Sequence, residues 1–243
     1  MSPALARIRP TVPHVAEAAL VVGLYLLYNA ARPFVEGTES IAVDHAFHII
    51  ALERAAGVFH EEQLQRIAYE HRWFGAAMEW TYLHAYHPLL VIGAALVYVR
   101  DRALYVRYRN VLFLSMAAGL IIFATFPVAP PRLLPEFGFV DDMRPAGELT
   151  SAIKNDYAAV PSYHFGFVLL AAVAVAQAYR PRVWIAAALM LIPGIMLISI
   201  VATANHFFFD AAAGAVIVLA ASWLLVWRAP AGGAARRHAP SPA

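Results

Sequence analysis

Long apolar stretches dominate this sequence and limit what it can fold into. A helix needs about 20 apolar residues to cross a hydrocarbon core of about 30 Å. Only 14% of the 243 residues are charged, against about a quarter in a soluble domain, so the surplus apolar surface is expected to face lipid. The sequence predicts an all-α, polytopic membrane helix bundle with six transmembrane helices, roughly at residues 12–31, 73–99, 111–126, 162–179, 183–204 and 207–227.

The distribution of arginines predicts how this bundle is oriented. Cytoplasmic loops of membrane proteins carry an excess of Lys and Arg. With the N-terminus inside, the cytoplasmic segments hold many arginines and a single acid, Asp101, whereas most acids fall on the outer side. Both termini are therefore expected in the cytoplasm. The Arg-rich, Ala-rich composition, with Lys154 as the one lysine, favours a bacterial cell membrane. Arg7 and Arg9 also fit a secretory signal, but Glu17 in the apolar stretch favours an uncleaved anchor.

Two outer segments are too polar to cross a membrane. Residues 36–72 alternate charged and apolar residues at helical spacing, which predicts one or two amphipathic helices lying on the membrane face. Residues 127–160 are proline-rich and charged, and they are expected to form a loop. We expect one membrane-embedded domain over residues 1–228 and a disordered cytoplasmic tail over 229–243. Several charges of the amphipathic segment are expected on a solvated helix face, namely Glu61, Glu62, Arg66 and Glu70.

Polar groups at the outer ends of the third, fourth and sixth stretches carry the candidate chemistry. Ionisable residues inside spans are costly and indicate function. His164 lies in the first turn of the fourth stretch, and His206 lies at the start of the sixth. Both helices begin on the outer face, so both N-termini would offer free N–H groups and a positive dipole end to an anion such as phosphate. A third polar group, Arg132, follows the third stretch.

The spacing of His206 and Asp210 predicts a hydrogen-bonded pair. Asp210 lies four residues after His206, on the same helical face. Its carboxylate can fix one ring nitrogen of His206 and leave the other as a nucleophile or base. With His164 as a separate acid, the set suits phosphoryl transfer through a phosphohistidine. An interhelical polar clasp is the alternative interpretation of the same residues.

Three short motifs resemble a known family. Val160-Pro-Ser-Tyr-His164 and His206-Phe-Phe-Phe-Asp210 resemble the second and third signature motifs of the type 2 phosphatidic acid phosphatase superfamily. Phe126-Pro-Val-Ala-Pro-Pro-Arg132 resembles the branch of inositol-phosphorylceramide synthases and related bacterial phosphotransferases. The resemblance implies that His206 attacks phosphorus, Asp210 orients it, and His164 protonates the leaving oxygen and then activates water or an alcohol. It implies a lipid-linked phosphate substrate, and neither cofactor, metal nor nucleic acid.

The sequence departs from the phosphatase branch at the phosphate-binding cations. That branch has a Ser-Arg pair before its last motif, but here Ser199 is followed by Ile200. Its first motif is also absent, because Phe137 stands where a lysine should precede Arg144. The substrate phosphate must therefore be bound by other residues. Our candidates are Arg132 first, then Arg144 and Lys154, together with Ser162 and Tyr163 of the second motif.

A further group lies on the outer half of the second stretch. Trp80, His84 and His87 follow the spacing i, i+4, i+7, with Tyr82 and Tyr86 nearby. This face suits either a cavity that admits a lipid headgroup, with His84 and His87 binding substrate, or an aromatic belt at the membrane interface.

Several functions remain open from the sequence. Water as acceptor would make a lipid phosphatase, and an alcohol such as inositol would make a headgroup transferase. A transporter or proton relay would need acids near mid-membrane, for which Glu17 and Glu79 are the other candidates. Paired intramembrane histidines could also bind haem. The sequence leaves the oligomeric state open.

Overall fold

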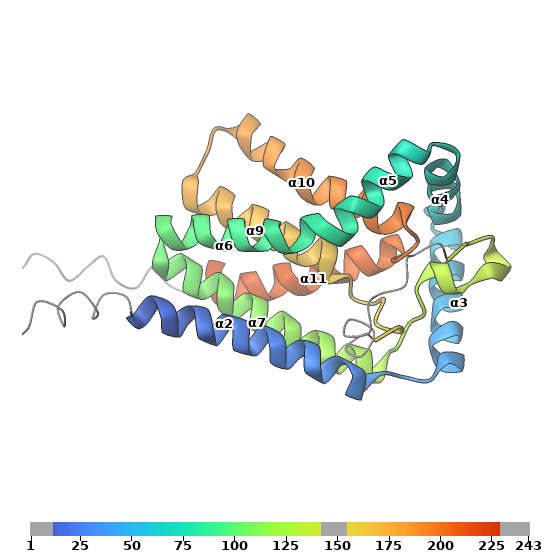
Figure 1. The fold of residues 1–243 in the computed structure, drawn as a ribbon, viewed down its shortest axis with the longest axis horizontal. Coiled ribbons are helices and arrows are strands. Elements are labelled where there is room, and N and C mark those ends of the chain that lie inside the picture. Colours follow the sequence, from blue (N-terminus) through green and yellow to red (C-terminus); the bar gives the residue numbers. More distant parts are fainter. Residues whose placement is uncertain (1–11, 142–154, 229–243) are drawn as a thin grey trace, which may run out of the picture.

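The computed structural model describes residues 12–141 and 155–228, and the regular elements in this part of the chain are helices (Figure 1). The bundle contains α2 (Val12–Ala31), a continuous rod made of α5 (Arg72–Trp80), a π-helical turn (Thr81–Ala85) and α6 (Tyr86–Arg100), and α7 (Arg102–Thr125). It continues with α9 (Tyr163–Tyr179), α10 (Val183–Ala202), α11 (Phe208–Ser222) and a second π-helical turn (Trp223–Trp227). Two candidate residues, Arg144 and Lys154, and the predicted tail lie outside the described residues.

Five of these helical segments are long and apolar enough to cross a membrane, so the chain is an integral membrane protein. They are His14–Val35, Arg72–Arg100, Arg102–Thr125, Val183–Ala202 and Phe208–Trp227. The remaining predicted span forms α9, which has 17 residues and is shorter than the hydrocarbon thickness of about 30 Å at 1.5 Å per residue. Helices α6, α7, α10 and α11 all pack against α9, which places it at the centre of the bundle.

The third predicted span is longer than expected at its N-terminal end. Helix α7 begins at Arg102 rather than near residue 111, because the Asp101 carboxylate caps it by accepting a hydrogen bond from the Leu104 N–H at 2.9 Å. The extra turns carry Arg109, whose guanidinium lies 2.7 Å from both carboxylate oxygens of Glu17 on α2. Glu17, which the sequence left open as a relay group, is thus part of an ion pair that joins two helices.

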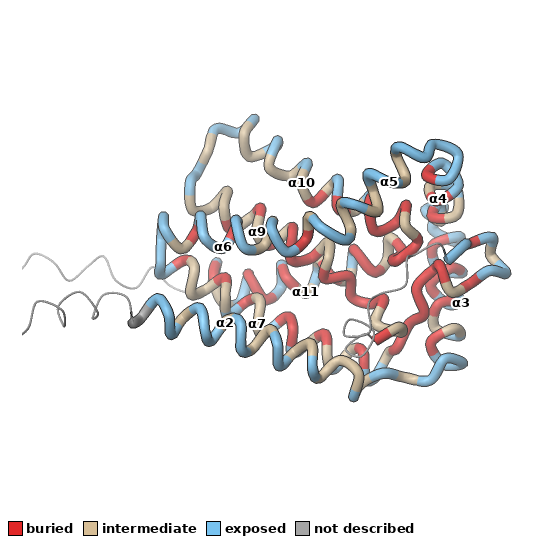
Figure 2. Tube along the Cα trace, in the orientation of Figure 1, coloured by how far each residue is buried: buried red, intermediate tan, exposed pale blue. Residues whose placement is uncertain are grey.

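The predicted amphipathic segment forms α3 (Glu39–Ala55) and α4 (Glu61–Glu70), which lie across one end of the bundle (Figure 1). The loop after α7 packs beneath them, with two short 3-10 turns at Pro131–Leu133 and Pro135–Phe137. A second apolar core forms there, separate from the core of the bundle, and Figure 2 shows its buried backbone at this end. Its α3 members are Ala42, Ala46, Ile49 and Ile50, and its loop members include Val128, Leu134 and Phe139.

The N-terminal ends of α9 and α11 are held in close contact. The Ser162 N–H donates to the Asp210 carbonyl at 2.9 Å. Gly214 allows this approach, because a Cβ at that position would clash with the Ser162 carbonyl oxygen. The two candidate histidines are therefore carried by helix ends that share a backbone hydrogen bond.

Candidate active site

The structure brings the two histidines together at the end of the bundle covered by α3 and α4. His164 lies in the first turn of α9, and His206 lies in the short connection between α10 and α11. Their ring centroids are 6.1 Å apart. The connection is tight because Ala204 adopts a left-handed conformation (φ 49°) and the N–H groups of both Asn205 and His206 donate to the Ile200 carbonyl.

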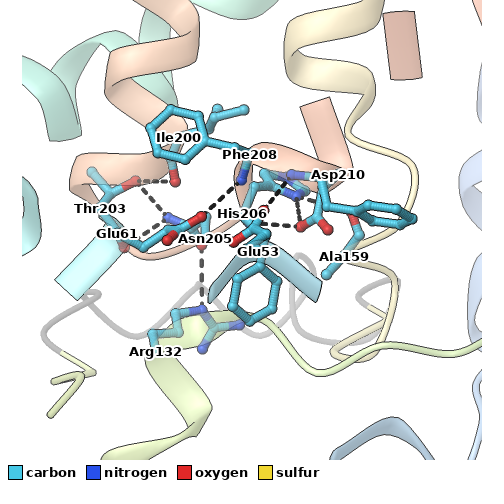
Figure 3. A network of polar contacts seen from close by, with 12 residues as sticks. Glu53, Glu61, Arg132, Ala159, Ile200, Thr203, Asn205, His206, Phe208 and Asp210 are labelled. Carbon is cyan, nitrogen blue, oxygen red and sulfur yellow. Dashed lines mark hydrogen bonds and ion pairs between the residues drawn. The ribbon is translucent and has the colours of Figure 1, made fainter. Parts of the chain in front are cut away.

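Two acceptors hold the same nitrogen of His206. Its Nδ1 lies 2.9 Å from the Ala159 carbonyl oxygen and 3.2 Å from Asp210 Oδ2 (Figure 3). A carbonyl oxygen can only accept a hydrogen bond, so Nδ1 must carry the proton. The neutral ring then has its lone pair on Nε2, the nitrogen expected to react.

The start of α11 is not the free anion seat that we expected. Its first N–H groups already donate to carboxylates: Phe207 to Asp210 at 2.9 Å, Phe208 to Glu61 at 3.0 Å and Phe209 to Glu53 at 2.7 Å (Figure 3). A phosphate at this helix end would have to displace three carboxyl groups that already accept these hydrogen bonds. The prediction for this helix terminus was therefore wrong.

Glu61 also corrects the expectation of a solvated face on α4. Glu61 and Glu53 are both buried, whereas Glu62 and Arg66 form an exposed i,i+4 pair at 3.5 Å. Glu61 is the first residue of α4 and points toward α11, so its neighbour Glu62 takes the outer face. Neither Glu53 nor Glu61 was among the site residues expected from the sequence.

The start of α9 does fit an anion. Helix α9 has no side-chain cap. Ser162, directly before it, is fully buried, and its Oγ has no hydrogen-bond partner within residues 12–141 and 155–228. A buried hydroxyl without a partner is costly unless a ligand supplies one. Of the two helix ends, α9 is the one whose surroundings favour a phosphate.

Tyr163, the next residue of the motif, is directed elsewhere. Its hydroxyl donates to the Ser115 carbonyl of α7, and its ring stacks on Phe167 at 4.3 Å. Gly119 of α7 makes room for the ring, since a Cβ there would clash with Tyr163 Cε2. Successive residues of a helix point about 100° apart, so the turn that places His164 in the site sends Tyr163 into the core. The Tyr163 hydroxyl is thus used inside the bundle rather than beside His164.

Two tyrosines surround His164 in place of the expected histidine face. The rings of Tyr82 and Tyr86 each lie 4.5 Å from the ring of His164. The ring of His87 packs against the ring of Tyr86, and its Nε2 lies 2.7 Å from the Tyr25 hydroxyl. His84 instead stacks on Trp80 at the exposed surface. The π-helical turn at Thr81–Ala85 widens the helix locally, so the i, i+4, i+7 pattern does not stay on one face.

Arg132 lies beside the connection that carries His206. Its backbone N–H donates to the Ala204 carbonyl at 2.9 Å, and its Nε donates to Asn205 Oδ1 at 3.3 Å. The guanidinium also pairs with Asp141 at 3.1 Å and Asp156 at 3.5 Å. Arg132 is therefore close to the predicted site, and its side chain is already engaged by neighbours.

A second arginine, which was not among the residues expected from the sequence, follows the end of α2. Arg32 is anchored through its carbonyl oxygen, which accepts from Asn155 Nδ2 at 3.0 Å. Its Nε is buried and has no partner within the described part of the chain. Its guanidinium carbon lies 6.0 Å from the centroid of the Phe123 ring on α7. Its position after the first apolar stretch gave no sequence signal that separates it from the other arginines.

The remaining motif position is structural. Ser199 Oγ donates to the Met78 carbonyl at 2.6 Å, which ties α10 to α5. Ile200, in the place of the branch's arginine, is fully buried in the bundle core. A cation at this position would therefore be surrounded by apolar side chains.

Comparison with known proteins identifies a family for this chain. A family model described as the PAP2 superfamily matches residues 48–224, which include both histidines and Asp210. Searches of curated proteins and of solved structures gave no significant match. Since the family model covers well over half of the chain, this phosphatase-like membrane protein belongs to the PAP2 superfamily.

Proposed function

We propose that the chain is a membrane phosphotransferase or phosphatase that acts on a lipid-linked phosphate ester through a phosphohistidine on His206. The observation that carries this proposal is the double anchoring of His206 Nδ1, which leaves Nε2 as the reactive nitrogen beside His164. A nucleophile oriented by a fixed acceptor, with a separate acid nearby, is what covalent phosphoryl transfer needs.

In the first step, His206 Nε2 attacks phosphorus while the bond from phosphorus to the leaving oxygen breaks. His164 donates a proton to that oxygen, and Asp210 stabilises the positive charge that develops on the His206 ring. In the second step, His164 takes a proton from the incoming hydroxyl group, whose oxygen attacks the phosphorus of phosphohistidine. Breaking the N–P bond restores the free imidazole. Tyr82 and Tyr86 hold the ring of His164 between these steps.

The phosphate charge is bound by groups from three parts of the chain. The α9 N-terminus and Ser162 Oγ supply hydrogen-bond donors. Arg32, which follows α2, and Arg132, in the loop after α7, supply positive charge. In this proposal Arg32 takes over part of the role of the arginine that Ile200 replaces. His87 lies at the edge of this group, where its Nε2 contacts the Tyr25 hydroxyl and its ring packs against the ring of Tyr86.

Sequence features support the acceptor and the location in this proposal. The Phe126–Arg132 motif favours the transferase branch, with an alcohol such as inositol as acceptor rather than water. The arginine distribution supports a cytoplasmic location for both termini and an extracytoplasmic location for the site, where a lipid substrate can enter from the bilayer.

The proposal is tested with purified protein in detergent and a panel of lipid phosphates, with and without inositol. Inorganic phosphate and lipid products are measured together, so hydrolysis and transfer are separated. We expect His206→Ala and His164→Ala to abolish turnover, and the exposed His48→Ala variant to behave like the wild type. Full activity in either site variant would overturn the assigned roles.

A further inference from the structure

A set of carboxylates surrounds the start of α11. Three successive N–H groups each donate to a different carboxylate, and two of these acceptors, Glu53 and Glu61, come from α3 and α4 (Figure 3). These two hydrogen bonds connect segments about 150 residues apart in the chain. They attach the outer helices to the helix end that bears His206 and Asp210.

The two glutamates share an unusual environment. Glu53 is 3% exposed and Glu61 is 0% exposed. Each uses Oε1 to accept a backbone N–H from adjacent residues, so the carboxyl groups lie side by side (Figure 3). Each Oε2 is buried without a hydrogen-bond partner within residues 12–141 and 155–228. Two buried carboxyl groups in contact with each other cannot both stay charged without a cation between them.

The charged groups around the pair do not neutralise it. Asp210 on α11 adds a further negative charge, and its own partner is His206. His60, which precedes α4, lines the same cavity as Glu53 at the end of α3. Arg132, from the loop after α7, pairs with Asp141 and Asp156. In the described part of the chain, the ion pairs include none to Glu53 or Glu61.

We propose that Glu53 and Glu61 share one proton between their Oε2 atoms, and that this carboxyl–carboxylate pair positions the His206–Asp210 pair. One shared proton gives each orphan oxygen a partner and reduces the pair to a single negative charge. That charge still caps the positive end of α11. Both glutamates are positioning residues, since they act through the helix end and do not touch the substrate.

Electrostatics favours this arrangement. Burial, and then the hydrogen bond with Glu61, raises the pKa of Glu53 to about 9. In the folded protein the proton is therefore present at neutral pH and is lost as the pH rises through about 9. Its loss places two like charges in contact, which weakens the caps on Phe208 and Phe209 and displaces the catalytic pair. Activity should fall on the alkaline side for this reason.

The same proton affects stability over a different pH range. An unfolded glutamate releases its proton near pH 4.5 and the folded Glu53 near 9. Between these values the folded state holds a proton that the unfolded state has lost. The stabilisation by the shared proton is fully present below the lower value and declines steadily up to the higher one. The melting temperature should therefore decrease with pH across this range.

The experiment uses Glu53→Gln and Glu61→Gln, with Glu62→Gln as a matched control. A Gln side chain keeps an acceptor for the α11 N–H and donates its amide to the remaining carboxylate, but it has no proton to lose. Glu62 is the exposed neighbour of Glu61 and pairs with Arg66. The kcat of each protein is measured against pH relative to its own maximum. The melting temperature in detergent is followed from about pH 5 to about pH 9, the range set by ordinary and raised carboxyl pKa values.

We expect the wild type and Glu62→Gln to lose about tenfold in kcat per pH unit above the raised pKa, as one titrating proton requires. Either buried Gln variant should lack this alkaline decrease and show a shallower decline of melting temperature. A purely structural role would lower the melting temperature without changing either pH profile. Identical pH profiles in all four proteins would overturn the proposal. The kinetic measurement rests on the proposed function, whereas the melting measurement needs no substrate, so the two failures can be told apart.

Discussion

The Ala159 carbonyl oxygen lies 2.9 Å from His206 Nδ1, closer than the Asp210 carboxylate at 3.2 Å. Because a carbonyl can only accept, the backbone of the loop before α9 fixes the tautomer of the proposed nucleophile. The carboxylate of Asp210 therefore adds mainly charge, and it also caps the Phe207 N–H.

This relationship predicts a moderate effect of Asp210→Asn. Where a carboxylate alone holds the tautomer of a catalytic histidine, its amide costs about 10⁴ in kcat. Here the Ala159 carbonyl keeps Nδ1 protonated, so we expect a loss of about 10² in kcat. Asp210→Ala, which also removes the cap, should be worse and less stable. Steady-state kinetics of both variants check this. A loss of about 10⁴ in Asp210→Asn would show that Ala159 does not hold the tautomer.

Gly214→Ala should separate the two histidines without touching either. The added Cβ would clash with the Ser162 backbone, so α9 and α11 must move apart. We expect a loss of about 1–3 kcal/mol in stability and a fall in kcat of at least about 100-fold, since misplacement by about 1 Å can cost that much. Gly194→Ala in α10 is the control, because its Cβ would meet nothing within 4 Å. Equal activity of the two variants would show that the close contact of α9 and α11 does not position the histidines.

Two buried serines should respond in opposite ways. Ser162 Oγ has no partner among the described residues, so Ser162→Ala should leave the melting temperature unchanged. It should lower kcat/KM by about 10- to 100-fold through loss of a hydrogen bond to charged phosphate. Ser199→Ala removes the bond to Met78, and it should lose about 0.5–1.5 kcal/mol of stability with turnover retained. Thermal melting and kinetics of both proteins test this. Loss of activity in Ser199→Ala together with loss of stability in Ser162→Ala would show that Ser199, not Ser162, contacts the phosphate.

Arg32 should contribute to substrate binding despite its distance in sequence from the motifs. Arg32→Gln removes a cation whose buried Nε has no partner in the described part of the chain. We expect kcat/KM to fall by about 10- to 100-fold, the size of a charge-assisted hydrogen bond. Arg66→Gln, which alters an exposed ion pair, is the control. Dependence of the loss on the charge of the phosphate ester would identify the contact. Unchanged kinetics in Arg32→Gln would leave Arg132 as the main cation.

The apolar stretches and short-range spacings predicted much of this structure. Helices form at all six predicted stretches, and the interval between His206 and Asp210 places them in contact because helix geometry is local. His164 lies in the first turn of a helix, as the fourth apolar stretch predicted. These features depend on residues a few positions apart, which a single sequence displays.

The errors concern features decided by tertiary contacts. Glu61 and Glu62 are equally charged neighbours, and only the packing of α4 onto α11 determines that Glu61 is buried. The π-helical turn changes the register between His84 and His87, which no spacing rule revealed. Tyr163 and Arg32 likewise received their places from α7 and from the loop at Asn155. Burial of a polar group and helix register both depend on partners far along the chain.

Trapping the phosphorylated protein tests the proposed nucleophile most directly. Wild type and His206→Ala are incubated briefly with a lipid phosphate labelled in its phosphoryl group, quenched, and the labelled residue is identified by mass spectrometry. We predict a phosphoryl group on His206 Nε2 in the wild type and no label in His206→Ala. Label on another residue, or undiminished label in His206→Ala, would contradict the central claim.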